Sequence, residues 1–136
     1  MIRSINRDPQ LLARKSAKAT PKDAAVVTDL VETLAAHRDG CVGMAANMIG
    51  VGRRIIAVAI GPLNVPMVNP RIIARQGAYA TQEGCLSLVG ERPTTRYETI
   101  TVQYLDGRFQ PQTQTFTGFV AQIIQHEVDH CDGIVI

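Results

Sequence analysis

The sequence predicts an α+β fold, and three observations carry this prediction. Apolar residues recur at helical spacing between Thr20 and His37. The middle of the chain contains short runs rich in β-branched residues, separated by glycine and proline. A second helical pattern covers 119–131, directly after the last of these runs. An N-terminal helix, antiparallel strands and a buried C-terminal helix are typical of the α+β class.

The first long helix is predicted to begin at Thr20-Pro21 and to end near His37. A hydroxyl residue followed by proline is a frequent helix start, because proline suits the first helical position. Asp39-Gly40 ends the pattern. Before it, 10–15 is a short helical or irregular piece. We interpret His37 as a polar residue of the last helical turn, where a basic side chain suits the helix dipole.

Strands are expected where apolar or alternating runs lie between turn signals. The expected strands are 55–60, 65–68, 71–74, 99–105 and 108–117. The expected breaks are Gly61-Pro62, Asn69-Pro70, Gln76-Gly77, a loop over 89–93 and a hairpin turn at Asp106-Gly107. Gly118 then opens the C-terminal helix.

Length and composition are those of an ordinary globular chain. The 136 residues suit a single domain, 1–136, with 46% hydrophobic and 19% charged residues. A formal net charge of +2 is too small to argue for nucleic acid or an anionic membrane. The sequence has no apolar run of bilayer length and no signal-peptide core, so we expect a cytoplasmic protein with reduced cysteines.

The stretch Gln125-His126-Glu127-Val128-Asp129-His130 carries the chemistry. Histidines four apart on a helix project from one face, so both imidazoles can reach one metal ion. The glutamate between them can act as a general base toward water. The alternative is an exposed helix end that happens to carry two histidines. The motif by itself is typical of metal hydrolases, most often proteases.

A third protein ligand is needed to complete an open catalytic metal site. The candidates are Cys85, Cys41, Cys131 and scattered carboxylates. Cys131 follows His130 directly, so on a helix it points about 100° away. Cys85 lies in a glycine-flanked loop where the backbone can approach a metal, which favours it over Cys41. A cysteine ligand also argues against a protease, since proteases usually complete the site with histidine or glutamate.

Two motifs in order make the sequence similar to a known family. Glu83-Gly84-Cys85-Leu86-Ser87 and the 125–130 stretch resemble, residue for residue, the second and third motifs of the peptide deformylases. Val68-Asn69-Pro70 and Gly118 are also similar, and the resemblance runs from near the N-terminus to Gly133. It implies a small α+β fold, one metal ion, and removal of the formyl group from N-formylmethionine of nascent peptides.

The resemblance also implies roles for individual residues. Cys85, His126 and His130 would bind the metal, Glu127 would be the general base and then the acid, and the Leu86 backbone amide would hold the oxyanion. The implied substrate-binding residues are Val42, Gly43, Gly84, Arg92, Gln122 and Ile123. The metal is expected to be divalent, with Fe2+ typical of the family and Zn2+, Ni2+ or Co2+ able to occupy the site. Asp129 and Asp132 are either partners of an imidazole or arginine, or helix-end charges.

The first family motif, Gly-x-Gly-x-Ala-Ala-x-Gln, is altered here. The run 41–48 has Cys41 in place of the first glycine and Met48 in place of the glutamine. In the family that glutamine donates a hydrogen bond to the formyl oxygen, and a thioether cannot donate. Either another donor such as Asn47 substitutes, or the chain is a weak enzyme or a metal-bearing peptide binder. We expect Cys41 to be a small buried residue. Because many members carry a further C-terminal segment, contact with the ribosome stays open.

Overall fold

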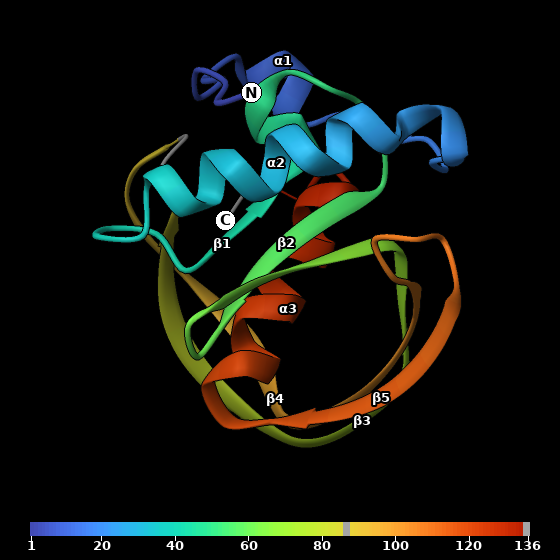
Figure 1. Cartoon of the computed structure of the whole chain (residues 1–136). Coiled ribbons are helices and arrows are strands. Elements are labelled where there is room, and N and C mark those ends of the chain that lie inside the picture. The colour runs from blue at the N-terminus through green and yellow to red at the C-terminus, as the bar shows by residue number, and fades with distance from the viewer. Residues whose placement is uncertain (86–87, 135–136) are drawn as a thin grey trace.

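The computed structural model describes residues 1–85 and 88–134, without the side chains of Cys85, Leu88 and Val89. Within this part of the chain, five strands form one antiparallel sheet in the order β1-β2-β3-β4-β5 (Figure 1). The strands are β1 (Gly43–Ala45), β2 (Ile55–Ile60), β3 (Leu63–Cys85), β4 (Leu88–Leu105) and β5 (Pro111–Thr117). The helices are α1 (Pro9–Leu12), α2 (Ala24–Ala36) and α3 (Gly118–Cys131), with 3-10 turns η1 (Pro21–Asp23) and η2 (Ala46–Ile49). The predicted α+β class is confirmed.

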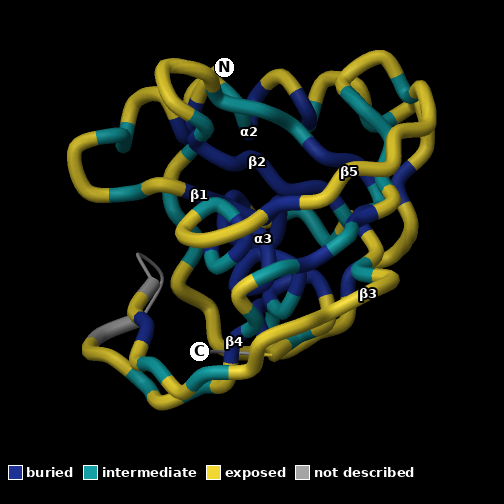
Figure 2. The backbone as a smooth tube through the Cα atoms, turned by 90° about the horizontal axis from the view of Figure 1, so that it is seen from below, coloured by how far each residue is buried: buried dark blue, intermediate teal, exposed yellow. Residues whose placement is uncertain are grey.

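Strand β2 is buried on both faces, because a helix covers each of them. Ile55 and Ala57 join the core cluster around α2, whereas Ile56 and Val58 join the cluster around α3. Successive side chains of a strand point to opposite faces, so this alternation assigns one face to each helix. In Figure 1, α2 and α3 lie on either side of β2. Figure 2 shows β2 and α3 as buried segments at the centre of the molecule.

Helix α2 packs through one apolar stripe. Val27, Leu30 and Leu34 are buried at helical spacing, together with Thr33. The predicted helix over 21–37 is therefore present, although its first turn is the 3-10 turn η1. None of the described helices is both long enough and apolar enough to cross a membrane.

The strands over 63–105 are longer than the sequence indicates, and three predicted breaks are wrong. β3 passes through Asn69-Pro70 with a register shift between Val68 and Arg71. Asn69 adopts a positive φ of 51°, and its side chain bonds both backbone groups of Ala19. The predicted turn at Gln76-Gly77 instead lies within β3, where Gly77 has a left-handed φ of 77°. The register shift at Asn69-Pro70 bends the strand without ending it, whereas the pairing with β4 keeps one register across Gly77.

The predicted loop over 89–93 is also wrong, because β4 already begins at Leu88. Glu83 pairs with Arg92, and Gly84 pairs with Glu91. β5 pairs with β4 only from Thr99 onward. Pro93 therefore lies where β4 has β3 as its sole described neighbour, and proline is tolerated at such an edge because its missing N–H can face outward. The hairpin turn at Asp106-Gly107 is confirmed, with Asp106 accepting backbone bonds from Arg108 and Gln110.

Candidate metal centre

The buried face of α3 brings together three side chains that can serve a metal. His126, Glu127 and His130 are 8%, 4% and 0% exposed. Their ligand atoms all lie within 4.8 Å of one another. The four-residue spacing stacks the two imidazoles on one side of the helix, and their Nε2 atoms are 3.2 Å apart. The alternative of an exposed helix end is therefore wrong.

The spacing of the two nitrogens fits a shared metal ion. Two imidazole nitrogens bound tetrahedrally at ordinary zinc distances would be separated by about 3.3 Å. The carboxylate Oε1 of Glu127 is also buried and has no hydrogen-bond partner among the described residues. Two converging imidazoles and a carboxylate without a partner are a donor set that suits a divalent cation.

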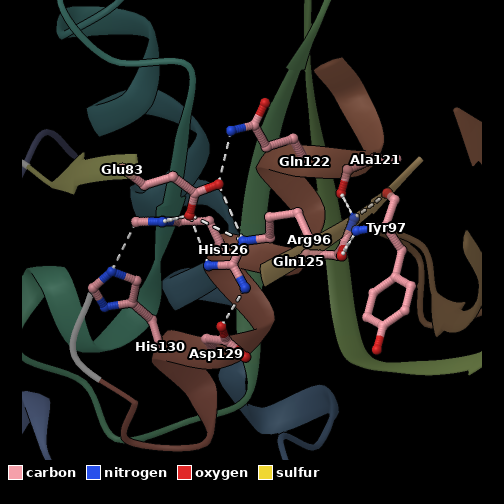
Figure 3. A network of polar contacts seen from close by, with 9 residues as sticks. All are labelled: Glu83, Arg96, Tyr97, Ala121, Gln122, Gln125, His126, Asp129 and His130. Carbon is pink, nitrogen blue, oxygen red and sulfur yellow. Dashed lines mark hydrogen bonds and ion pairs between the residues drawn. The ribbon is translucent and has the colours of Figure 1, made fainter. Parts of the chain in front are cut away.

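A network of ion pairs holds the first imidazole (Figure 3). Nδ1 of His126 lies 2.8 Å from Oε1 of Glu83. Arg96 donates to both oxygens of Glu83 at 2.7–3.1 Å and also pairs with Asp129 at 2.6 Å. Side chains of Glu83 and Arg96 are only 7% and 5% exposed. With its Nδ1 proton donated to Glu83, His126 presents the Nε2 lone pair to the metal position.

The pKa values suit these roles. Burial alone would raise the pKa of Glu83, but hydrogen bonds from His126, Arg96 and Gln122 outweigh it and lower this pKa to about 2. Burial lowers the pKa of His130 to about 3, so the imidazole is neutral and can offer a lone pair. Burial raises the pKa of Glu127 to about 7, with Glu83 and Asp129 adding to the rise.

A cavity of about 590 Å³ opens onto this centre. Its described lining residues are Gly40, Cys41, Val42, Gly43, Met48, Gln82, Glu83, Gly84, Gly90, Glu91, Phe119, Gln122, Ile123, His126 and Glu127. Five of the six predicted substrate-binding residues are among them. Arg92 is not, so its place along the groove stays a prediction.

The backbone carbonyls of Val42 and Gly43, two predicted substrate-binding residues, already accept hydrogen bonds within the protein. The carbonyl of Val42 accepts from the Ala59 N–H at 2.8 Å, and that of Gly43 accepts from the Cys41 thiol at 2.9 Å. A pairing of these residues with an extended peptide therefore also stays a prediction.

Because Gly43 has no side chain, β1 can lie directly against Glu127, the predicted general base. A Cβ at this position would lie 2.6 Å from Cγ2 of Ile123 and 2.9 Å from Oε2 of Glu127. Both distances are too short for any side chain. The absence of a side chain at Gly43 thus fixes how close the strand can come to the Glu127 carboxylate.

We expect Gly43→Ala to destabilise the protein by about 1–3 kcal/mol, the usual cost of overpacking. It should also displace Glu127 and lower any hydrolytic activity. Denaturant unfolding of the purified variant measures the first effect. Gly52→Ala is the matched control, because a Cβ there meets nothing within 4 Å. Equal stability of the two variants would contradict the proposed close contact.

The segment that faces the centre carries Asn47 and Met48. Nδ2 of Asn47 donates to the His130 carbonyl at 2.8 Å, and Asn47 is 1% exposed. Sδ of Met48 accepts from the Ala45 N–H at 3.4 Å, and Met48 is equally buried while also lining the cavity. The Asn47 amide is therefore engaged on the helix backbone and does not replace the glutamine donor.

The remaining predicted residues divide into three groups. Asp129 and Asp132 pair with Arg96 and Arg54, which is the arginine partnership the sequence left open. Cys131 is buried in the core, where burial raises its thiol pKa to about 12, and Cys41 is half-buried at the cavity. The Cys85 side chain and the Leu86 amide lie outside the described residues, so their roles stay predictions.

The roles of Glu83 and Arg96 at the metal centre were not predicted from the sequence. One signal was present for Glu83, because it lies two residues before Cys85, a candidate metal ligand. No local pattern marks Arg96, which reaches the centre only because β4 pairs with β3.

Comparisons of the sequence and of the fold with known proteins point to one family. A family model described as polypeptide deformylase matches residues 2–136. A peptide deformylase of Clostridium beijerinckii is 53% identical over 136 residues, which is all of both chains. A peptide deformylase crystal structure from Legionella pneumophila covers 98% of this chain and 82% of its own, at TM-score 0.87 and 32% identity. A Met-Ala-Ser-bound class I type b enzyme from Acinetobacter baumannii covers 99% and 97%, at TM-score 0.86 and 28% identity.

Proposed function

Because this chain belongs to the peptide deformylase family, we propose that it hydrolyses the formyl amide of N-formylmethionyl peptides and releases formate. The observation that carries the proposal is the pair of Nε2 atoms 3.2 Å apart, beside the buried Glu127 carboxylate. Nascent peptides are the proposed substrates, and the cytoplasm is the proposed location of the reaction. Tripeptide binding by the Acinetobacter enzyme supports a peptide ligand for the shared cavity.

One divalent metal ion is part of the proposal. His126, His130 and Cys85 would hold it, with Fe2+ as the natural ion and Zn2+, Ni2+ or Co2+ as substitutes. When bound, such an ion polarises the formyl carbonyl and brings the pKa of water toward neutrality. Glu83 would not bind the ion itself. It orients the His126 imidazole through the 2.8 Å contact between Oε1 of Glu83 and Nδ1 of His126.

Glu127 performs the proton transfers in this proposal. Its carboxylate accepts the proton of the attacking water and then delivers it to the leaving amine. Burial raises the pKa of Glu127 to about 7 in the metal-free protein, and a bound cation would lower it, so the ionised carboxylate would meet the attacking water. The backbone amide of Leu86 would stabilise the oxyanion.

The cavity supplies the binding surface for the substrate. Val42, Phe119 and Ile123 provide apolar lining for the methionine side chain, and Gln122 lies beside them. Gln122 donates to Glu83 at 2.8 Å, so its amide is held within the same network. The backbone of β1 at Gly43 and that of β3 at Gly84 would lie on either side of the extended peptide.

We expect Met48→Gln to increase kcat/KM for formyl-Met-Ala-Ser by about 10²–10³, because it adds the missing oxyanion donor. Met48→Leu is the matched control, since leucine fills the same volume and donates nothing. Steady-state formate release measures both variants. A glutamine variant no faster than the leucine variant would show that position 48 does not contact the reacting oxygen.

The Met48 observation also favours a second candidate, a metal-bearing binder of formylated N-termini without turnover. Equilibrium binding of formyl-Met-Ala-Ser separates the two functions. If the natural chain binds this peptide, while neither it nor Met48→Gln releases formate, the binder is the better description.

The test of the proposed reaction compares two bonds in one peptide. Anaerobically iron-loaded protein is incubated with formyl-Met-Ala-Ser, and both formate and internal cleavage products are quantified. We expect formate and intact Met-Ala-Ser, with no release by Glu127→Ala. Cleavage of an internal peptide bond would instead identify a protease, and formate release equal to the Glu127→Ala background would refute a deformylase.

A further inference from the structure

A second hollow, of about 740 Å³, shares no described lining residue with the metal centre cavity. Its lining residues are Lys15, Lys18, Arg54, Asn69, Pro70, Arg71, Gln103, Tyr104, Leu105, Pro111, Gln112, Thr113 and Asp132. They come from the segment before α2, the residue before β2, the bulge of β3, the ends of β4 and β5, and the residue after α3. Nothing in the proposed reaction uses this surface.

The hollow concentrates the positive charge of the chain. Four basic side chains and one carboxylate line it, a net charge of +3, whereas the whole chain carries +2. Asp132 is paired with Arg54. Among the contacts of the described residues, Lys15, Lys18 and Arg71 have no acidic partner. Three cations are therefore available to an anion from outside.

Hydrogen bonds fix the segments that carry these charges. The Arg54 N–H donates to the Ala17 carbonyl at 2.8 Å, which ties Arg54 beside Lys18. Asn69 bonds both backbone groups of Ala19 at 2.8 and 2.9 Å. Nη2 of Arg54 donates to the Pro70 carbonyl at 2.7 Å. The strand bulge, the N-terminal segment and Arg54 thus form one framework.

The metal centre cavity differs from the hollow in its side chains. Its described lining includes neither lysine nor arginine. A phosphate backbone therefore finds cationic side chains at the basic hollow and none in the described lining of the metal centre cavity. Binding at the hollow leaves the first cavity accessible.

We propose that the basic hollow binds the phosphodiester backbone of nucleic acid. Lys15, Lys18 and Arg71 are all exposed, so the hollow is open at the surface and suits a strand that passes through it. A small phosphorylated molecule would instead require a site that encloses most of its surface. Gln103 and Thr113 add neutral donors, and half-buried Tyr104 adds an aromatic face of the kind on which bases stack.

This inference reverses the prediction made from the average charge of the chain. A net charge of +2 is too low for nucleic-acid binding when it is spread over the surface. The fold gathers residues that lie up to 117 positions apart, from Lys15 to Asp132, into one charged site. The local charge, and not the total, decides whether a phosphate backbone is attracted.

The test measures binding of a fluorescein-labelled 12-nucleotide single-stranded RNA by anisotropy between 50 and 200 mM salt. Three phosphate contacts predict a log–log salt slope of about −2, so affinity should fall about 20-fold over this range. Lys15→Gln/Lys18→Gln leaves one contact, and its affinity should fall only about threefold. Thermal unfolding checks that each variant is folded.

Lys22→Gln/Arg108→Gln is the matched control, because it removes two exposed cations that lie outside the hollow. Its salt slope should equal that of the natural chain. Equal slopes for the two double variants would overturn the proposal, as would the absence of binding at 50 mM salt. Inorganic pyrophosphate is also added at the same concentration as the RNA, at constant ionic strength. If it displaces the RNA, the hollow is a site for small phosphates and the proposal is wrong. Formate release is not part of this test, so its outcome is independent of the proposed function.

Discussion

Replacing Glu127 by glutamine is expected to lower kcat for formyl-Met-Ala-Ser by about 10²–10⁴, the usual worth of a general base. Glutamine keeps the size and polarity of the side chain but cannot accept the proton of the attacking water. Steady-state formate release with iron-loaded protein measures the effect. Glu98→Gln, an exposed carboxylate on β4, is the control and should retain the activity of the natural chain.

Metal content separates the chemical role of Glu127 from a structural one. Glu127→Gln should still bind one metal per chain, because both histidines and Cys85 are unchanged. A variant that loses its metal together with its activity would show that Glu127 acts as a ligand. A variant that keeps both would contradict the assignment of Glu127 as the base.

The same substitution should change how stability depends on pH in the metal-free protein. Burial raises the pKa of Glu127 from 4.5 to about 7, so between these values the folded state binds a proton that the unfolded state has released. The contribution of Glu127 to the free energy of unfolding therefore falls as the pH rises, by about 3 kcal/mol in total. The free energy of unfolding of Glu127→Gln should exceed that of the natural chain increasingly from pH 4 to pH 8. A constant difference would contradict the raised pKa.

Glu83→Ala is expected to be the most destabilising substitution, at about 3–5 kcal/mol in denaturant unfolding of the metal-free protein. It leaves the nearly buried Arg96 guanidinium without its main partner, and it removes the acceptor of the His126 Nδ1 proton. Affinity for the metal should also fall by about 10–100-fold, since the imidazole is no longer oriented. Competition with a chelator of known affinity measures this second effect.

Glu98→Ala is the control for this comparison, and its stability should change by less than about 0.5 kcal/mol. The pKa of Glu83, lowered to about 2, predicts that its contribution is present above the ordinary carboxyl pKa of 4.5 and is lost as the pH falls toward 2. The difference between Glu83→Ala and the natural chain should therefore shrink below about pH 4. A difference that does not depend on pH would contradict the ion-pair account.

The elements that follow local rules could be predicted from the sequence. Helix spacing located α2 and α3, and the four-residue histidine spacing placed both imidazoles on one buried face. Asp106-Gly107 located the hairpin. Each of these depends on neighbouring residues alone.

The features that were mispredicted or missed depend on contacts between distant segments. Asn69-Pro70 indicates a break by local rules, but Ala19 bonds the Asn69 side chain and the strand continues. Arg96 joins the metal centre only through strand pairing with the region of Glu83. The sequence allowed the Asn47 side-chain amide to donate a hydrogen bond to the substrate. Only the fold shows that this amide donates to the His130 carbonyl instead.

The most direct test of the metal-dependent reaction is an anaerobic titration of metal-free protein with Fe2+, followed by formate release from formyl-Met-Ala-Ser. We expect activity to rise linearly and to stop at one ion per chain, because His126 and His130 converge on one position next to Glu127. Cys85 is the proposed third ligand of that same ion. The His126→Ala variant should show no such rise. Bound iron at one equivalent without formate release, or release that does not depend on added iron, would contradict the account.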